Sequence, residues 1–490
     1  MRQILTFLML TPFLALSQQS LATEQEALDV NGVSTMFGPA AMCWDFNDAR
    51  YEVPKGSSKH SIFAHDLWIG GIDDGGQLRV ANQTYNQSPG DYRPGPVSDS
   101  IYHNDADMGH WDRVWKIHKS EIDYHILNYT NPAYIIPDVI VFWPAHGDVS
   151  MGQSDMLAPF VDLNTNGIYE PFDGDYPDIK GDQAIYFIRN DVGSLDTTSL
   201  GLEIHMMIYA YRCDNYPDLN HTVFVNTTLF NRGSHNLEDV YIGTWTDMDL
   251  GYYTDDYIGC NVPLNLGYTF NGDTLDEGAN GYGINPPAQG LVYLNSIMEK
   301  FVYYNNDFTN TGNPESDYDY YNYLRGIWKD NVPMTFGGDG HGSGNGATNN
   351  TCSYMFPDAT DPSFPTEAWT DSSAGNTPAD RRMLMSTGPM DLDIGDSYIF
   401  DYAFVFAWDS INGNSLPLLF QYTENIQDFY DGTLTMPCSN INTIHQHHIL
   451  KDKKLIKIVD VIGREVQATE NTPLFFIYED GSVEKKIIIE

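Results

Sequence analysis

Apolar and polar side chains alternate along many short segments of this chain. In residues 202–209, Leu202, Ile204, Met206 and Ile208 fall on one face of an extended strand. Further short runs rich in β-branched and aromatic residues, separated by Gly, Pro, Asn and Asp, predict strands at 61–69, 184–189, 223–230, 240–245, 291–294, 382–385 and 398–408. We therefore expect a mainly β protein whose body is β-sandwich-like.

Helical periodicity is confined to two segments, so we expect few and short helices. The apolar positions of residues 419–429 recur at helical spacing, and Gly432 ends that pattern. Ser120 together with Asp123 predicts the capped start of a short helix that runs to residue 127.

Chain length and segment composition suggest five parts. Residues 1–22 read as a signal peptide, with Arg2 before an apolar run too short to span a bilayer and small residues that offer cleavage after Ser17 or Ala22. The body is longer than one hydrophobic core usually organises, so we expect one or two subdomains, divided as 23–200 and 201–437. Residues 438–450 resemble a linker, residues 451–490 form a separate terminal module, and no later segment predicts a transmembrane helix.

The body is strongly acidic. The chain has a formal net charge of −42, and residues 1–450 carry 59 Asp and Glu against 18 Lys and Arg. Such a surface repels nucleic acid and anionic lipid, which excludes nucleic acid as an expected partner, and it attracts multivalent cations. The five cysteines are widely spaced without a CxxC pair, so zinc or redox chemistry is not indicated and their pairing stays open.

The last forty residues predict a small β-sandwich-type module. Runs at 455–462, 474–478 and 483–489 are apolar, and Asp480-Gly481 between the last two is a strong hairpin signal. The segments 453–455, 459–465 and 473–486 resemble the type A C-terminal sorting domain of type IX secretion cargo in Bacteroidota. That resemblance implies export to the cell surface or medium, with the type IX secretion machinery as the partner of this module.

A calcium-type loop is the strongest chemical motif. Its oxygen-bearing side chains stand at positions 1, 3, 5, 9 and 12 of a twelve-residue EF-hand-like loop, with Gly167 at position 6 and a main-chain carbonyl at position 7. The predicted ligands are Asp162, Asn164, Asn166, Ile168, Glu170 and Asp173, and Asp175, Asp178 and Asp182 follow closely enough to complete a Ca2+ shell through residue 182. The alternative is a turn rich in Asp and Asn without an ion.

A second acidic cluster lies near a predicted strand end. Asp247, Asp249, Asp255 and Asp256 fall within ten residues, where carboxylates repel one another unless they are solvated or bridged by a cation. A second calcium site and a solvated acidic loop are both consistent with this spacing.

Most of the body resembles a widespread family of Bacteroidota surface proteins to which no activity is assigned. The resemblance rests on segments 59–63, 67–71, 94–96, 173–183, 247–259, 380–382 and 386–389. It implies location and not mechanism.

Known catalytic signatures are missing, since the chain contains no HExxH, GxSxG or P-loop motif. We therefore expect a calcium-stabilised structural or adhesion-type protein of the cell surface. One alternative is a module that binds an extracellular glycan or anionic polysaccharide, with the tyrosines of residues 318–323 stacking on sugars. The other is an extracellular hydrolase with a pair of catalytic carboxylates.

Overall fold

The computed structural model describes residues 23–45, 48–85, 91–99, 109–192, 198–344, 346–438, 455–459, 464, 473–478 and 483–487. The chain divides into two compact units, the body (residues 1–438) and the tail unit (residues 439–490). The predicted signal peptide and nearly all of the predicted linker lie outside the described residues.

The first of two large antiparallel sheets in the body has ten strands, ordered β21-β22-β15-β6-β3-β2-β4-β5, with β1 beside β2 and β7 beside β6. Its long central strands each contain at least seven consecutive buried residues, as expected for strands covered on both faces. The strands are β1 (Glu26–Leu28), β2 (Ser34–Gly38), β3 (Ala41–Met42), β4 (Tyr51–Glu52), β5 (His60–Ile62), β6 (Ala64–Asp73), β7 (Leu78–Ala81), β15 (Leu237–Met248), β21 (Lys300–Asn305) and β22 (Arg381–Leu392).

The second sheet has nine strands, ordered β16-β17-β20-β23-β14-β13-β12-β8, with β9 also beside β12. The strands are β8 (Arg93–Pro94), β9 (Trp115–His118), β12 (Gln183–Asn190), β13 (Leu202–Ala210), β14 (Thr222–Asn231), β16 (Asp256–Asn261), β17 (Leu266–Asn271), β20 (Ala288–Tyr293) and β23 (Ser397–Ala407). Short pairs form elsewhere between β10 (Phe160–Val161) and β11 (Tyr176–Pro177) and between β18 (Leu275–Asp276) and β19 (Gly283–Ile284).

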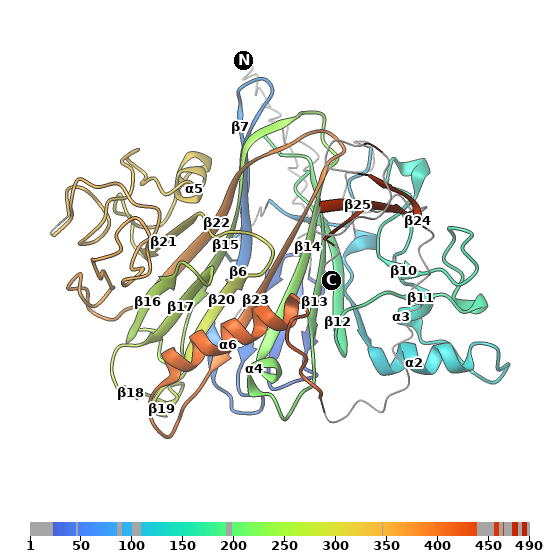
Figure 1. Cartoon of the computed structure of the whole chain (residues 1–490), viewed down its shortest axis with the longest axis horizontal. Coiled ribbons are helices and arrows are strands. Elements are labelled where there is room, and N and C mark those ends of the chain that lie inside the picture. Colours follow the sequence, from blue (N-terminus) through green and yellow to red (C-terminus); the bar gives the residue numbers. More distant parts are fainter. Residues whose placement is uncertain are drawn as a thin grey trace, which may run out of the picture. The chain divides into compact units, whose positions relative to one another are not determined.

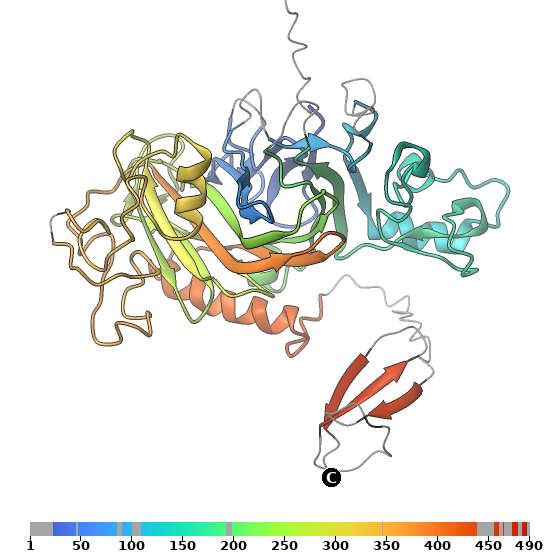
Figure 2. The same cartoon turned by 90° about the horizontal axis from the view of Figure 1, so that it is seen from above.

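The two sheets pack as one sandwich (Figures 1 and 2). Polar contacts between the sheets cross the apolar core: His65 Nε2 lies 2.8 Å from the Tyr402 hydroxyl, and Arg189 Nη2 donates to Asp66 Oδ1 at 2.7 Å. Both members of the Arg189–Asp66 ion pair are almost fully buried. The boundary that the sequence suggested at residue 200 separates β12 from β13, which pair along their length, so the body is one sandwich and not two subdomains.

The apolar alternation in residues 202–209 forms the predicted strand, but both faces of this strand are buried. Leu202, Ile204, Met206 and Ile208 belong to the core cluster between the sheets. The opposite face of β13 is also buried, because a second apolar cluster forms there beneath helix α6 (Ser415–Tyr430) and the segment that connects β9 to β12. The mainly β, sandwich-like fold is confirmed, with α6 lying across β20 and β23 in Figure 1.

The described helices are short apart from α6. They are α2 (Lys119–Asn128), α3 (Asp138–Val141), α4 (Pro217–Asn220) and α5 (Asp317–Leu324), with 3-10 turns η2 (Gly109–Trp111), η3 (Val149–Met151) and η4 (Pro171–Asp173). Helix α2 begins slightly earlier than predicted, since His118 is its N-cap and Glu121, not Asp123, completes the capping box. The tyrosine run 318–323 forms α5, where Tyr321 and Tyr323 are buried and Tyr320 packs edge-on against Trp68.

The tail unit contains three antiparallel strands, β24 (Leu455–Val459), β25 (Pro473–Tyr478) and β26 (Val483–Ile487). The pairing of Ile477 with Val483 gives the hairpin that the sequence predicted, although Asp480 and Gly481 lie outside the described residues. Within the described parts of the chain, no helix combines the length and apolar character needed to cross a membrane.

One disulfide joins Cys213 to Cys438, across 225 positions of sequence. Cys213 follows β13, and Cys438 is the final residue of the body, so the bond ties the end of the body to the second sheet. Cys43, Cys260 and Cys352 are free thiols.

Candidate metal centre

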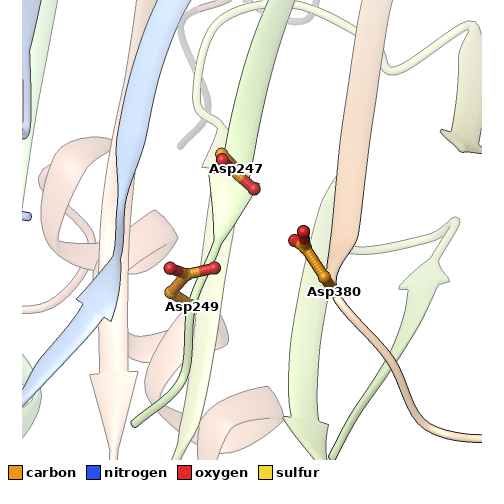
Figure 3. A group of neighbouring side chains, drawn as sticks. All are labelled: Asp247, Asp249 and Asp380. Atoms are coloured by element: carbon orange, nitrogen blue, oxygen red, sulfur yellow. The ribbon is translucent and has the colours of Figure 1, made fainter. Parts of the chain in front are cut away.

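Antiparallel pairing of β15 with β22 builds a cluster of three carboxylates, Asp247, Asp249 and Asp380. The register places Asp247 opposite Arg382 and Met248 opposite Arg381. Asp249 follows the end of β15 and Asp380 precedes the start of β22, so two residues far apart in sequence meet at the same end of the strand pair (Figure 3). One oxygen of each carboxylate lies within 4.8 Å of one from each of the other two.

Asp247 is the best-fixed member of the cluster. Its residue exposure is 2%, and its Oδ2 accepts hydrogen bonds from the Tyr85 hydroxyl at 2.6 Å and Arg382 Nη2 at 3.2 Å. The other oxygen, Oδ1, is buried without a hydrogen-bond donor. Arg382 Nη1 is 2.9 Å from Asp380 Oδ1, but the two groups lack hydrogen-bond geometry, so this contact is an ion pair only.

The electrostatics of this cluster favour an added cation. Burial raises the pKa of Asp247 to about 6, although Arg382 opposes the shift. Burial, followed by repulsion from Asp247 and Asp380, also raises the pKa of Asp249 far above its ordinary range. If all three carboxyls are ionised, they leave an excess of negative charge beside the one guanidinium, and a divalent cation would neutralise it.

The ligand chemistry is that of a site for a hard divalent cation. All three carboxylates present hard oxygen ligands, and the described cluster contains neither a thiolate nor an imidazole. Calcium takes six to eight oxygens in flexible geometry, so water or main-chain carbonyls would supply the remainder. The residues present therefore suit a calcium ion.

The loop at 162–173 folds around its own side chains. Asp162 accepts from the main-chain N–H groups of Gly167 at 2.7 Å and Thr165 at 2.6 Å, which hold the pKa of its carboxyl below the ordinary range. Asn164 and Asn166 both donate through Nδ2 to Glu170 Oε2. Asn164 and Asn166 thus both contact Glu170, and Asp162 accepts from the main chain of the same loop. However, no three carboxylates of the described loop converge as those of the cluster do.

Asp175 supports this loop from beneath. It is fully buried, and its two oxygens accept from Leu163 N and Glu170 N, each at 2.8 Å. Both oxygens are therefore occupied by the main chain. Asp182 lies elsewhere, where its Oδ2 accepts from Arg212 N at the end of β13. Ile168, Asp173 and Asp178 are exposed.

Replacing Asp175 with alanine should lower the free energy of unfolding by about 2 kcal/mol, because two partly buried N–H groups lose their acceptors. The measurement is chemical unfolding of the full chain in excess chelator. Asp173→Ala is the matched control, since the Asp173 side chain is exposed, and it should change stability by less than about 0.5 kcal/mol. Equal effects of the two changes would contradict the supporting role of Asp175.

Asp255 and Asp256 do not join the three-carboxylate cluster, although the sequence grouped them with Asp247 and Asp249. Asp256 is fully buried, its Oδ2 accepts from Leu250 N, and burial raises its pKa strongly. Burial, followed by the Glu277 carboxyl, raises the pKa of Asp255 to about 7. The half-buried Asp255 and the buried Asp256 instead lie near Asp276.

Asp380 is the candidate ligand that sequence reasoning missed. It stands more than a hundred positions after Asp249, and only the β15–β22 register brings the two together. The sequence signal was Asp380-Arg381-Arg382 directly before a predicted strand, but strand pairing cannot be read from one sequence.

Comparison of the chain with models of known protein families, and with curated proteins, finds no match.

Proposed function

We propose that this chain is an exported protein of the cell surface or extracellular medium, with a β-sandwich body that binds calcium for stability and serves a structural or adhesive role. The observation that carries the cation part is the buried Asp247 Oδ1, which has no hydrogen-bond donor and lies in a cluster with Asp249 and Asp380. A buried charged oxygen without a donor is costly unless a cation compensates it.

Export rests on separate support. The resemblance of residues 451–490 to a type IX sorting domain motivates the proposal, and the Cys213–Cys438 disulfide is in keeping with folding in an oxidising compartment. The division of the chain after Cys438 agrees with a terminal module that is distinct from the body.

Calcium should stabilise the full chain by about 2.7 kcal/mol at a hundredfold excess over its dissociation constant, since only the folded chain assembles the cluster. Asp380→Asn should abolish most of the gain in melting temperature between chelator and calcium. Asp391→Asn, which changes an exposed carboxylate on the same strand pair, should retain the gain. Asp162→Asn reports separately on the loop at 162–173. Coincident melting curves in calcium and chelator would refute the cation part.

Deleting residues 451–490 should leave the body folded but retain it in the periplasm, because the tail unit carries the export sequence. Cell fractionation tests whether the truncated protein stays in the periplasm, and a melting curve tests whether its body is folded. Normal surface display of the truncated protein would refute the export part and leave the calcium proposal untouched.

A further inference from the structure

Two buried tryptophans donate hydrogen bonds to the glycine-rich loop at 337–344. Trp328 Nε1 donates to the Gly340 carbonyl at 2.8 Å, and Trp369 Nε1 donates to the Gly338 carbonyl at 3.1 Å. Both indole rings are buried. Gly337, Gly338 and Gly340 have φ between 58° and 94°, where a side chain would strain the backbone, so glycine permits this tight path.

A hydrogen-bonded series of serine, histidine and aspartate lies at this loop. The Ser343 hydroxyl is 2.7 Å from His341 Nδ1, and His341 Nε2 is 3.0 Å from Asp330 Oδ2. The Ser343 main-chain N–H also points at Nδ1, at 3.2 Å. Because an N–H group can only donate, Nδ1 must be the accepting nitrogen, and the proton of the neutral ring is on Nε2, facing Asp330.

The surroundings fix the base and expose the hydroxyl. His341 is 9% exposed, whereas Ser343 is exposed. The Asp330 carboxylate is held by Asn310 Nδ2 on Oδ2 and by the Val332 N–H on Oδ1. A nucleophile within hydrogen-bond reach of a base, which a third group orients, is the geometric signature of an activated serine.

We propose that Ser343 is a nucleophile, His341 its general base and Asp330 the positioning residue, and that the three hydrolyse small carboxylic esters. Ser343 Oγ bonds to the ester carbonyl carbon while its proton moves to His341 Nδ1. His341 returns that proton to the departing alcohol as the ester C–O bond breaks, which leaves an acyl-serine. A water molecule then attacks the acyl carbon and loses a proton to His341. His341 returns that proton to Ser343 Oγ as the bond between Oγ and the acyl carbon breaks and the acid is released.

The Ser343 N–H competes with the hydroxyl for the same lone pair of His341. Its contact is longer than that of the hydroxyl, and it must open when Nδ1 takes the proton. Gly342 has open space beside it, since a Cβ there would meet only Thr335 Cγ2, at 3.8 Å, so a small ester can reach Ser343 from solvent.

The test uses the purified full chain in calcium with a fluorophosphonate probe, which phosphonylates activated serines, and with p-nitrophenyl acetate. Mass spectrometry should place the probe on Ser343 in the wild type and in the control Ser372→Ala, an exposed serine of a neighbouring loop. Ser343→Ala should remove the label, and His341→Ala should slow labelling about a hundredfold or more. Asp330→Asn should slow it and lower the pH midpoint of labelling, since the imidazolium loses its carboxylate.

An unlabelled Ser343, or a labelling rate unchanged by His341→Ala, would overturn the proposal. A loss of melting temperature in Asp330→Asn without any change in labelling or its pH midpoint would also overturn it, because a purely structural contact behaves in this way. None of these outcomes depends on the cluster of Asp247, Asp249 and Asp380.

Discussion

In chelator, Asp247→Ala lowers the free energy of unfolding by about 3 kcal/mol, because the buried Arg382 loses its main partner and keeps only the ion pair with Asp380. It also removes the acceptor of the Tyr85 hydroxyl. Asp249→Asn has the opposite sign under the same conditions. It removes a carboxylate that is buried and that Asp247 and Asp380 repel. Among the described residues this carboxylate makes no ion pair, although Arg382 attracts it from farther away.

Equilibrium unfolding in urea with excess chelator measures both effects. The same measurement in calcium separates the effect of each change on the stability of the fold from its effect on calcium binding. Asp249→Asn should lose the calcium gain that the wild type shows, although it is the more stable protein in chelator. Asp391→Asn should behave as the wild type in both conditions. If Asp247→Ala and Asp249→Asn changed stability in the same direction in chelator, the assignment of Arg382 to Asp247 would be wrong.

Calcium affinity should fall about tenfold for each pH unit below pH 6, as long as one proton competes with the ion. The pKa of Asp247 is about 6 in the folded chain and its ordinary value is 3.8. A carboxyl whose folded-state pKa is raised stabilises the fold below its unfolded pKa, and this contribution is lost as pH rises through 6. In chelator, therefore, the cluster should make the body less stable at pH 7 than at pH 5.

Calcium should reverse this trend, because we expect the ion to bind the ionised carboxylates. The difference in melting temperature between calcium and chelator should be large at pH 7 and small at pH 5. Asp249→Asn, which lacks one of the raised carboxyls, should show a weaker dependence on pH in both conditions. A calcium gain of equal size at the two pH values would show that the ion binds elsewhere, for example at the exposed loop around Asp162.

Local pattern was sufficient for much of the fold. The apolar alternation of residues 202–209 predicted strand β13 and its core face, and the helical spacing of residues 419–429 predicted α6. Sequence could not show that the outer face of β13 is covered as well, because Glu203 and His205 on that face are polar. These two buried side chains are hydrogen-bond partners of each other, with His205 Nε2 at 3.0 Å from Glu203 Oε1.

How much of each candidate site could be predicted depended on how far apart its residues lie in the sequence. The loop at 162–173 was visible because all of its oxygens are local, and the Asp162 to Gly167 contact follows from that spacing. Only Asp247 and Asp249 of the three-carboxylate cluster could be predicted, since Asp380 comes close to them through strand pairing. The same holds for His341 and Asp330, whose contact requires the glycine-rich loop to turn back on the chain.

The Cys213–Cys438 bond has a mechanical consequence. Tension applied through the residues after Cys438 reaches the end of the body at this covalent link, and it passes directly to Cys213 beside strand β13. Helix α6 and the strands between the two cysteines lie within the closed loop and outside the covalent path of the load. A pull on the tail unit therefore cannot peel α6 from the sheet, and the second sheet itself takes up the force.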